Sequence, residues 1–199
     1  MNNLLIGGGA IAGIVCGAVV VLAIVILAVW YVSTYNKLKR VDNMVDEGWA
    51  TIDVHLKKRY DLIPNLVETV KGYAKHESET LEKVIAARKM AMTAGTPDEK
   101  AQAENMLSGT LKSLFALRLE ERYPELKADA NFMDLMNQLK SVESEIASAR
   151  RYYNGTVKEL NTLLDYFFTG MVGRKMKLEK RKYFELESEE ERKAPQVKF

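Results

Sequence analysis

Hydrophobic and polar positions divide the chain at residue 36. The first 36 residues contain no Asp, Glu, Lys or Arg, and residues 4–32 form an apolar run interrupted only by glycines. A helix needs about 20 such residues to cross the hydrocarbon core of a bilayer. Trp30, Tyr31 and Tyr35 lie at the end of the run, where an interfacial aromatic belt is expected. The pattern therefore predicts a transmembrane helix.

Two alternatives to a membrane anchor fit this run less well. A cleaved signal peptide has a basic segment followed by an apolar stretch of about 7–15 residues, whereas this stretch is longer and no Lys or Arg precedes it. Residues 13–15 before Cys16 make a poor lipoprotein signal. Lys37, Lys39 and Arg40 follow the run, so the positive-inside rule predicts an external N-terminus and a cytosolic C-terminal domain.

Beyond residue 36, apolar residues recur with helical spacing, and no segment alternates with period two. Steps of three and four positions are typical of the buried face of an amphipathic helix. The pattern predicts an all-α protein. Its two stripes comprise Val45, Trp49, Ile52, Leu56, Tyr60, Ile63, Val67, Val70, Ala74, Leu81, Val84 and Arg88, and then Val142, Ile146, Ala149, Tyr153, Val157, Leu160, Leu164 and Phe167.

Capping residues and prolines predict where these helices begin and end. The sequence TPDE at 96–99 combines an N-cap threonine, a proline at the first helical position and a glutamate two positions later, which is a strong helix start. Pro64 should break or kink the preceding helix, with a weaker capping box from Asn65, and Pro124 marks the next junction. The predicted helices are 33–60, 66–93, 98–119 and 129–168.

Four helical passes of similar reach favour an N-terminal transmembrane helix followed by an up-and-down antiparallel four-helix bundle. The alternative is a three-helix arrangement with one long helix, 33–93, kinked at Pro64. With an even number of passes, the last helix returns toward the membrane. The expected division is a transmembrane anchor at 1–36, a cytosolic bundle at 37–168 and a basic and acidic tail at 169–199.

Charge and composition exclude several function classes. The chain has 29 Lys and Arg against 27 Asp and Glu, so no global charge favours nucleic acid. A single Cys excludes internal disulfides and Cys-based zinc sites. His76 begins an HExxH-like motif, but position 80, where zinc needs a second histidine, is Thr. A di-iron site needs a glutamate three residues before each histidine, and Ile52 and Tyr73 occupy these positions. With no phosphate-binding loop or GxSxG motif, we expect no enzyme, metal or cofactor.

Two features of the sequence suggest contacts within or beside a membrane. Gly9, Gly13 and Gly17 share one helix face, which favours self-association of the span and a homo-oligomer; the alternative is that glycine is simply common in membrane helices. An apolar segment around Phe167 precedes a basic one, which favours contact with anionic lipid. The basic residues of this predicted membrane surface are Lys37, Lys39, Arg40, Arg174, Lys175, Lys177, Lys180, Arg181 and Lys182. The alternative is an ordinary solvated helix end, since glutamates at 185, 187 and 189–191 offset the charge.

Polar residues also line one face of the last predicted helix. Glu143, Arg150, Asn154 and Asn161 are spaced by seven, four and seven positions. We expect residues from the second helix and its entry turn to oppose them, namely Asp61, Asn65, Glu77 and Arg88. The first interpretation is a half-buried polar network that fixes helix register. The second is a groove that binds a partner segment. No nucleophile–base pair supports catalysis.

Several motifs in order resemble the LemA family over nearly the whole chain. They begin with Tyr35-Asn36 after the anchor, Trp49 and Ile52-Asp53. LKKRYDLIPNLV at 56–67, VKGYAKHE at 70–77, Ala87-Arg88, YPEL at 123–126, ARRYYN at 149–154 and Asn161 follow, and the tail matches at Tyr183-Phe184-Glu185, Pro195, Val197 and Phe199. One departure is Phe168-Thr169-Gly170, where the family usually has Phe-Pro.

The resemblance implies a bacterial single-pass protein of the cytoplasmic (inner) membrane with a cytosolic helical bundle and no established enzymatic activity. One relative takes part in building magnetosome membranes, and others are linked to a membrane-bound metalloprotease or to small envelope proteins. We therefore expect a non-enzymatic scaffold or adaptor that acts by protein–protein interaction or membrane shaping. The alternative is a regulatory subunit of a membrane metalloprotease or of envelope quality control. The expected partners are membrane lipid, further copies of the chain and such envelope proteins, and not nucleic acid.

Overall fold

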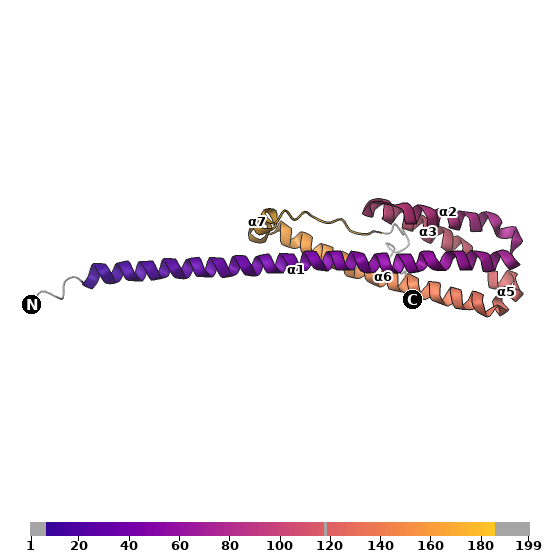
Figure 1. Cartoon of the computed structure of the whole chain (residues 1–199), viewed down its shortest axis with the longest axis horizontal. Coiled ribbons are helices and arrows are strands. Elements are labelled where there is room, and N and C mark those ends of the chain that lie inside the picture. The colour runs from indigo at the N-terminus through magenta and orange to yellow at the C-terminus, as the bar shows by residue number, and fades with distance from the viewer. Residues whose placement is uncertain (1–6, 118, 186–199) are drawn as a thin grey trace, which may run out of the picture. The chain divides into compact units, whose positions relative to one another are not determined.

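The computed structural model describes residues 7–117 and 119–185, and this part of the chain is helical, with no strand (Figure 1). The prediction of an all-α protein is confirmed. A short 3-10 turn, η1 (Lys75–Glu77), separates the first two helices. The helices are α1 (Gly7–Tyr73), α2 (Ser78–Thr93), α3 (Pro97–Ala116), α4 (Leu119–Arg122), α5 (Pro124–Ala128), α6 (Ala130–Asp165) and α7 (Phe167–Lys175).

The chain forms two compact units, each described by itself. Unit 1 contains Met1–Val45 and Val157–Arg181, and unit 2 contains Asp46–Thr156 and Lys182–Phe199. The predicted division at residues 36 and 168 stays a prediction, because packing units do not mark the position at which a chain leaves lipid.

Unit 2 is an up-and-down bundle. The end of α1, α2, α3 and the first part of α6 run alternately in opposite directions (Figure 1), which confirms a helical bundle with four long passes. Most of the apolar positions that the stripes predict are buried in it. Its fully buried apolar side chains include Ile52, Leu56, Ile63, Leu81, Leu107, Leu114, Leu126 and Phe132.

The predicted chain reversal at Pro64 is wrong. Helix α1 continues through Pro64 to Tyr73, and the chain reverses at Ala74 and η1. The predicted end at residue 60 and start at residue 66 therefore do not exist, and neither does the weaker capping box from Asn65. The alternative of one helix over 33–93 is also wrong, because α1 ends twenty residues earlier.

A side chain from another helix allows α1 to accommodate Pro64. Proline has no N–H, so the carbonyl four residues earlier, that of Tyr60, loses its donor in the helix. The Nε of Arg88 on α2 donates to this carbonyl oxygen at 2.7 Å. Arg88 therefore replaces the missing backbone donor, and it ties α2 to α1 at the same point.

The predicted start of α3 is confirmed. The Thr96 hydroxyl accepts a hydrogen bond from the Glu99 N–H at 3.2 Å, and Glu99 accepts one from the Thr96 N–H at 3.1 Å. Pro97 occupies the first turn, where it has no intrahelical partner to lose. The Thr96 backbone hydrogen bond lowers the pKa of the Glu99 carboxyl, so the carboxylate form holds the cap.

In unit 1, α6 ends at Asp165 and α7 begins at Phe167, where one helix to residue 168 was predicted. The following helix packs closely on the end of α6 because two glycines face it. A Cβ on Gly170 would lie 2.4 Å from the Leu164 carbonyl oxygen, and one on Gly173 would lie 2.4 Å from the Leu164 side chain. Gly170 and Gly173 therefore permit an approach that larger residues would prevent.

Candidate functional site

Helix α7 contacts α1 at the level where the apolar run ends. The rings of Phe168 and Trp30 lie edge to face with centroids 6.0 Å apart, and the Lys175 Nζ lies 5.8 Å from the centroid of the Tyr31 ring. Phe168 and Lys175 are two helical turns apart, yet they meet neighbouring residues of α1. Helix α7 therefore crosses α1 rather than following it (Figure 1).

One face of α7 is apolar and exposed. Phe167 is 70% exposed and Phe168 is 63% exposed, while Gly170, Val172 and Gly173 are buried on the other face. The stripe pattern placed Phe167 in the core, and that prediction is wrong because the chain leaves α6 before reaching it. We call the exposed side chains of Trp30, Tyr31, Tyr166, Phe167, Phe168 and Met171 the interfacial surface.

The nine basic residues of the predicted membrane surface are exposed, but they differ in their partners. Four form ion pairs within their own unit: Lys39 and Arg181 with Asp42, Lys180 with Asp165, and Lys182 with Asp98. Lys175 stands over Tyr31. The other four make no ion pair with another described residue, namely Lys37, Arg40, Arg174 and Lys177. Unit 1 therefore keeps positive charge at 37–40 and 174–177, beside the interfacial surface in sequence.

The apolar part of α1 is long enough and apolar enough to cross a membrane, and none of it is buried within the protein. It is the one such helix in the described part of the chain. The predicted glycine face starts at Gly9 in the first turn of α1. A Cβ on Gly13 or Gly17 meets no described atom within 4 Å, so this face is open, and self-association through it stays a prediction.

A buried polar network connects the helices of unit 2. Arg59 and Glu104 are each 1% exposed and form an ion pair. The Arg59 guanidinium also donates to Glu143 at 2.6 Å and to Ser108 at 3.1 Å. The Tyr60 hydroxyl donates to the second oxygen of Glu104. A buried charge is tolerated when it is paired and hydrogen-bonded. The network depends on the Glu104 carboxylate, because both Arg59 and Tyr60 donate to it.

The network includes two of the predicted residues and two that the sequence reasoning missed. Arg88 joins it through the Tyr60 carbonyl, and Glu143 through Arg59. Burial raises the pKa of the Tyr60 hydroxyl to about 12, so this hydroxyl remains a donor at neutral pH. The sequence reasoning missed Arg59, three positions after the buried Leu56, and Glu104, three positions before the buried Leu107. A charged residue at such a position was the available signal.

Asn154 and Asn161 bind main-chain groups of the tail. In unit 2 the Asn154 side chain accepts from the Phe184 N–H at 2.9 Å and donates to the Phe184 carbonyl at 3.2 Å. In unit 1 Asn161 makes the same two bonds with Arg181, each at 2.9 Å. Backbone groups of the tail, and not the second helix, therefore satisfy these two members of the predicted polar face.

Two of the remaining predicted polar residues form ion pairs outside the network. Asp61 is exposed and pairs with Lys57 at 2.8 Å, and Glu77 pairs with Arg122 at 2.9 Å. Arg150 is half-buried. Within residues 7–117 and 119–185, no group of His, Cys, Asp and Glu is arranged to hold a metal ion.

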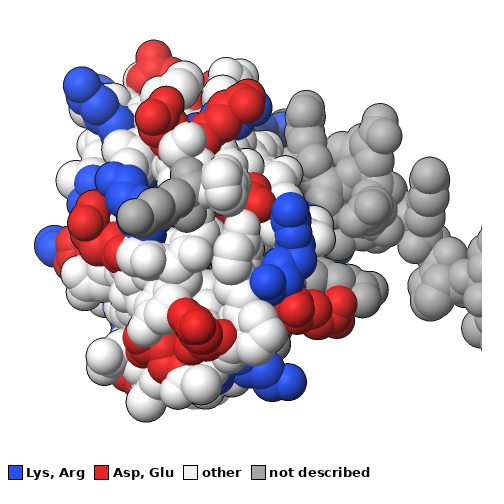
Figure 2. Space-filling view, turned by 90° about the vertical axis from the view of Figure 1, so that its right-hand side faces the viewer, with Lys and Arg blue, Asp and Glu red and all other residues white. Residues whose placement is uncertain are grey.

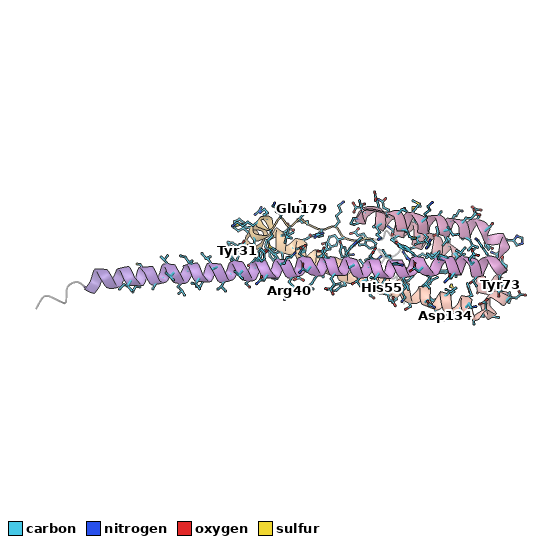
Figure 3. All side chains as sticks on the ribbon, viewed as in Figure 1. Tyr31, Arg40, His55, Tyr73, Asp134 and Glu179 are labelled. Atoms are coloured by element: carbon cyan, nitrogen blue, oxygen red, sulfur yellow. The ribbon has the colours of Figure 1, made fainter. Side chains whose placement is uncertain are left out.

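Asn65 lines an open groove of about 510 Å³ between α1 and α6 in unit 2. Asp134, near the beginning of α6, lies on its other side (Figure 3). The groove is shallow and polar, so it suits a surface contact better than an enclosed small molecule. Its lining residues are Leu62, Asn65, Glu68, Thr69, Asn131, Asp134, Leu135 and Gln138.

The end of unit 2 that contains the α1–α2 turn and α5 carries charges of both signs. Figure 2 shows acidic and basic side chains in small separate groups around a largely uncharged centre. Among its described residues, this face has no continuous basic patch, the feature that recognition of a phosphate backbone requires.

The LemA family model matches residues 48–199, about three quarters of the chain. The chain belongs to the LemA family. Protein LemA of Metamycoplasma hominis is 27% identical over 152 residues, which cover 74% of this chain and 67% of that relative. The LemA match includes the bundle and the tail and begins after the apolar run. Neither the family description nor the name of the relative states a reaction, a ligand or a partner.

Motif residues that carried the LemA resemblance have structural roles in this chain. The Arg88 side chain donates to the Tyr60 carbonyl that Pro64 leaves without a helical donor, and the Asn154 side chain accepts a hydrogen bond from the Phe184 N–H. Gly170, the last residue of the Phe168-Thr169-Gly170 segment that departs from the family pattern, permits the contact between α7 and α6. The acidic residues at 187 and 189–191 and the matches at Pro195, Val197 and Phe199 lie outside the described residues.

Proposed function

We propose that this LemA protein is a non-enzymatic scaffold or adaptor, anchored by α1 in the cytoplasmic membrane of a bacterium, with its bundle in the cytosol. One observation carries the proposal: an amphipathic α7 crosses α1 at the level of Trp30 and Tyr31 and exposes Phe167 and Phe168 there. Aromatic and basic side chains are enriched at this depth of a bilayer, and a helix with one apolar face lies in the plane of the interface.

The area of exposed aromatic surface supports this placement. Two phenylalanines exposed by about two thirds present roughly 250 Å² to their surroundings. At about 25 cal/mol per Å² this area corresponds to roughly 6 kcal/mol of favourable transfer into lipid. The neighbouring Arg174 and Lys177 add attraction to anionic headgroups, about 1 kcal/mol for each residue near the surface. Helix α7 would then set the depth of the span and attach the start of the bundle to the membrane surface.

The function that remains is the binding of other proteins or the shaping of the membrane. The charged groups at the centre of unit 2 pair with one another, which supports a structural role for them, and the Arg59 Nε is the buried atom of this cluster without a hydrogen-bond partner among the described residues. Partners would therefore meet the exposed surface of the bundle, for which the groove around Asn65 is one position. A regulatory subunit of a membrane metalloprotease, the alternative, would use the same groove.

Quenching by brominated lipids tests the membrane placement. In a background with Trp30→Phe and Trp49→Phe, a single tryptophan is introduced at Phe167 and, as the matched control, at Tyr152, which is 44% exposed in unit 2. In vesicles of mixed neutral and anionic lipid, the tryptophan at 167 should be quenched and the control should not. Equal quenching at both positions would exclude an interfacial α7.

Crosslinking in native membranes tests the scaffold function. The wild-type chain should yield defined adducts with other envelope proteins or with further copies, and Asn65→Arg should remove those that form at the groove. A chain that gives no adduct under conditions that capture known membrane complexes would argue against a scaffold. Altered turnover of membrane proteins on deletion, with rescue lost in Asn65→Arg, would favour the protease alternative.

A further inference from the structure

The groove around Asn65 in unit 2 combines an apolar floor with a polar rim. Leu62 of α1 and Leu135 of α6 are half-buried in it, whereas most polar residues of its lining are exposed. The lining extends over residues 62–69 of α1 and 131–138 of α6. At about 1.5 Å per residue each wall is about 10 Å long, which about three residues of an extended chain cover. An apolar centre within a polar rim is the composition of a protein-binding patch.

The two walls carry carboxamides that the chain itself does not use. The side chains of Asn65 on α1 and Asn131 on α6 make no hydrogen bond with another described residue. A carboxamide both donates and accepts, so it can pair with the N–H and the C=O of one residue. Asn154 and Asn161 do this with the tail, at 2.9–3.2 Å. Because a helix uses these main-chain groups internally and an extended chain leaves them free, the carboxamides of the groove favour an extended segment.

The charge of the lining is negative. Glu68 on α1 and Asp134 on α6 line the groove, and none of the lining residues is Lys or Arg. Asp134 accepts a hydrogen bond from Gln138 at 2.7 Å and makes no ion pair with another described residue. Glu68 pairs with Lys71 at 3.3 Å, but these side chains are 76% and 48% exposed, and such a surface pair is weak. The two carboxylates therefore favour an occupant with a basic side chain.

We propose that the groove around Asn65 binds an extended, basic segment of another protein. The Asn65 and Asn131 carboxamides pair with its main chain, Asp134 with a Lys or Arg, and Leu62 and Leu135 receive an apolar side chain. Successive side chains of an extended segment point to opposite sides, so basic and apolar residues that alternate fit the rim and the floor. The inference rests on the proposed function, because it names the kind of segment by which the adaptor recognises its partner.

Fluorescence anisotropy with a synthetic peptide tests the groove. The probe is a fluorescein-labelled peptide of sequence GSKLKLKSG, and the matched peptide GSELELESG replaces each lysine with glutamate. The full-length chain is titrated in a nonionic detergent, with empty micelles as the blank. Asp134→Asn and Asn131→Ala alter the groove. Glu82→Gln and Asn137→Ala, at exposed positions of unit 2 outside the lining, are their matched controls.

The lysine peptide should bind the wild-type chain, and the glutamate peptide should not. Asp134→Asn should weaken binding about threefold, as the loss of one exposed ion pair does. Asn131→Ala should weaken it about fivefold through the loss of hydrogen bonds, and both controls should bind as the wild type does. Circular dichroism checks that each variant is folded. Equal binding of the two peptides, or equal binding by Asp134→Asn and Glu82→Gln, would overturn the inference.

Absence of binding to the wild-type chain would overturn it as well, since other residues of this chain then fill or close the groove. Two chains per micelle in light scattering, without peptide binding, would assign the groove to a second copy instead. Crosslinking in membranes separates this inference from the proposed function. Adducts that Asn65→Arg removes, without peptide binding, would leave the scaffold and exclude the basic segment. Peptide binding without adducts would support the groove and argue against the scaffold.

Discussion

Replacing Arg88 should destabilise the bundle chiefly because position 64 is a proline. Arg88→Met removes the donor that satisfies the Tyr60 carbonyl at 2.7 Å, while keeping much of the apolar stem. A hydrogen bond from a charged group contributes about 1.5–3 kcal/mol, and a buried carbonyl left without a partner costs about 1–3 kcal/mol. We therefore expect the free energy of unfolding to fall by roughly 2 kcal/mol in the wild-type background.

The same substitution should cost less when Pro64 is replaced. Pro64→Ala restores the N–H that donates to the Tyr60 carbonyl within α1, so this oxygen keeps a partner after Arg88→Met. The double-mutant cycle should show a coupling of about 1–2 kcal/mol, well above the error of additivity for independent sites. Lys89→Met, an exposed neighbour on α2, is the matched control for loss of a positive charge.

Urea denaturation of the full-length chain in detergent, followed by circular dichroism, measures the cycle. With a denaturant dependence of about 1–3 kcal/mol per M, a loss of roughly 2 kcal/mol moves the midpoint by about 1 M. Equal losses for Arg88→Met in the wild-type and Pro64→Ala backgrounds would refute the reasoning. They would show that Arg88 stabilises the bundle by some means other than the carbonyl that Pro64 leaves free.

Three further predictions concern the network and α7. Glu104→Ala leaves the buried guanidinium of Arg59 short of a counter-charge and should lower the free energy of unfolding by about 3–5 kcal/mol, measured by urea denaturation. Burial raises the pKa of Tyr60 to about 12, so the folded state holds this proton more tightly than the unfolded state does. The contribution of Tyr60 to the free energy of unfolding is therefore complete below about pH 10 and is lost as the pH rises toward about 12. In alkaline titrations, stability should fall less steeply in Tyr60→Phe than in the wild-type chain. Gly170→Ala should accelerate hydrogen exchange of the α7 amides, because its Cβ meets a backbone oxygen of α6 at 2.4 Å, whereas Gly72→Ala, with open space, should not.

Local signals in the sequence were sufficient for most of the fold. The capping box at Thr96 depends on residues within one helical turn, so its prediction required no knowledge of the tertiary structure. The apolar stripes likewise place most core residues correctly, because burial follows the helical period. Pro64 shows the limit of such rules. Proline breaks a helix when the carbonyl it leaves free has no partner, and here the partner is Arg88, 24 residues later in the sequence and on another helix.

The candidate site was predictable in type and not in detail. The apolar and basic sequence around residue 170 indicated a membrane contact, but the crossing of α7 over α1 depends on the close approach at Gly170, which is a tertiary feature. The spacing of Asn154 and Asn161 identified a polar face. Their partners are backbone groups of the tail, and no pattern of side chains in the sequence encodes a bond to main-chain atoms.

The placement of polar groups in unit 2 restricts where this protein can act. Arg59 on α1, Glu104 on α3 and Glu143 on α6 meet at one point, and Arg88 adds α2 through the same turn of α1. Apolar stripes alone tolerate a slip of one helix along another, whereas a buried charge has one position in which it is satisfied. A bundle held in one register by its own charges presents fixed outer surfaces. On the proposed function, partners would then be recognised on those surfaces and not within the core.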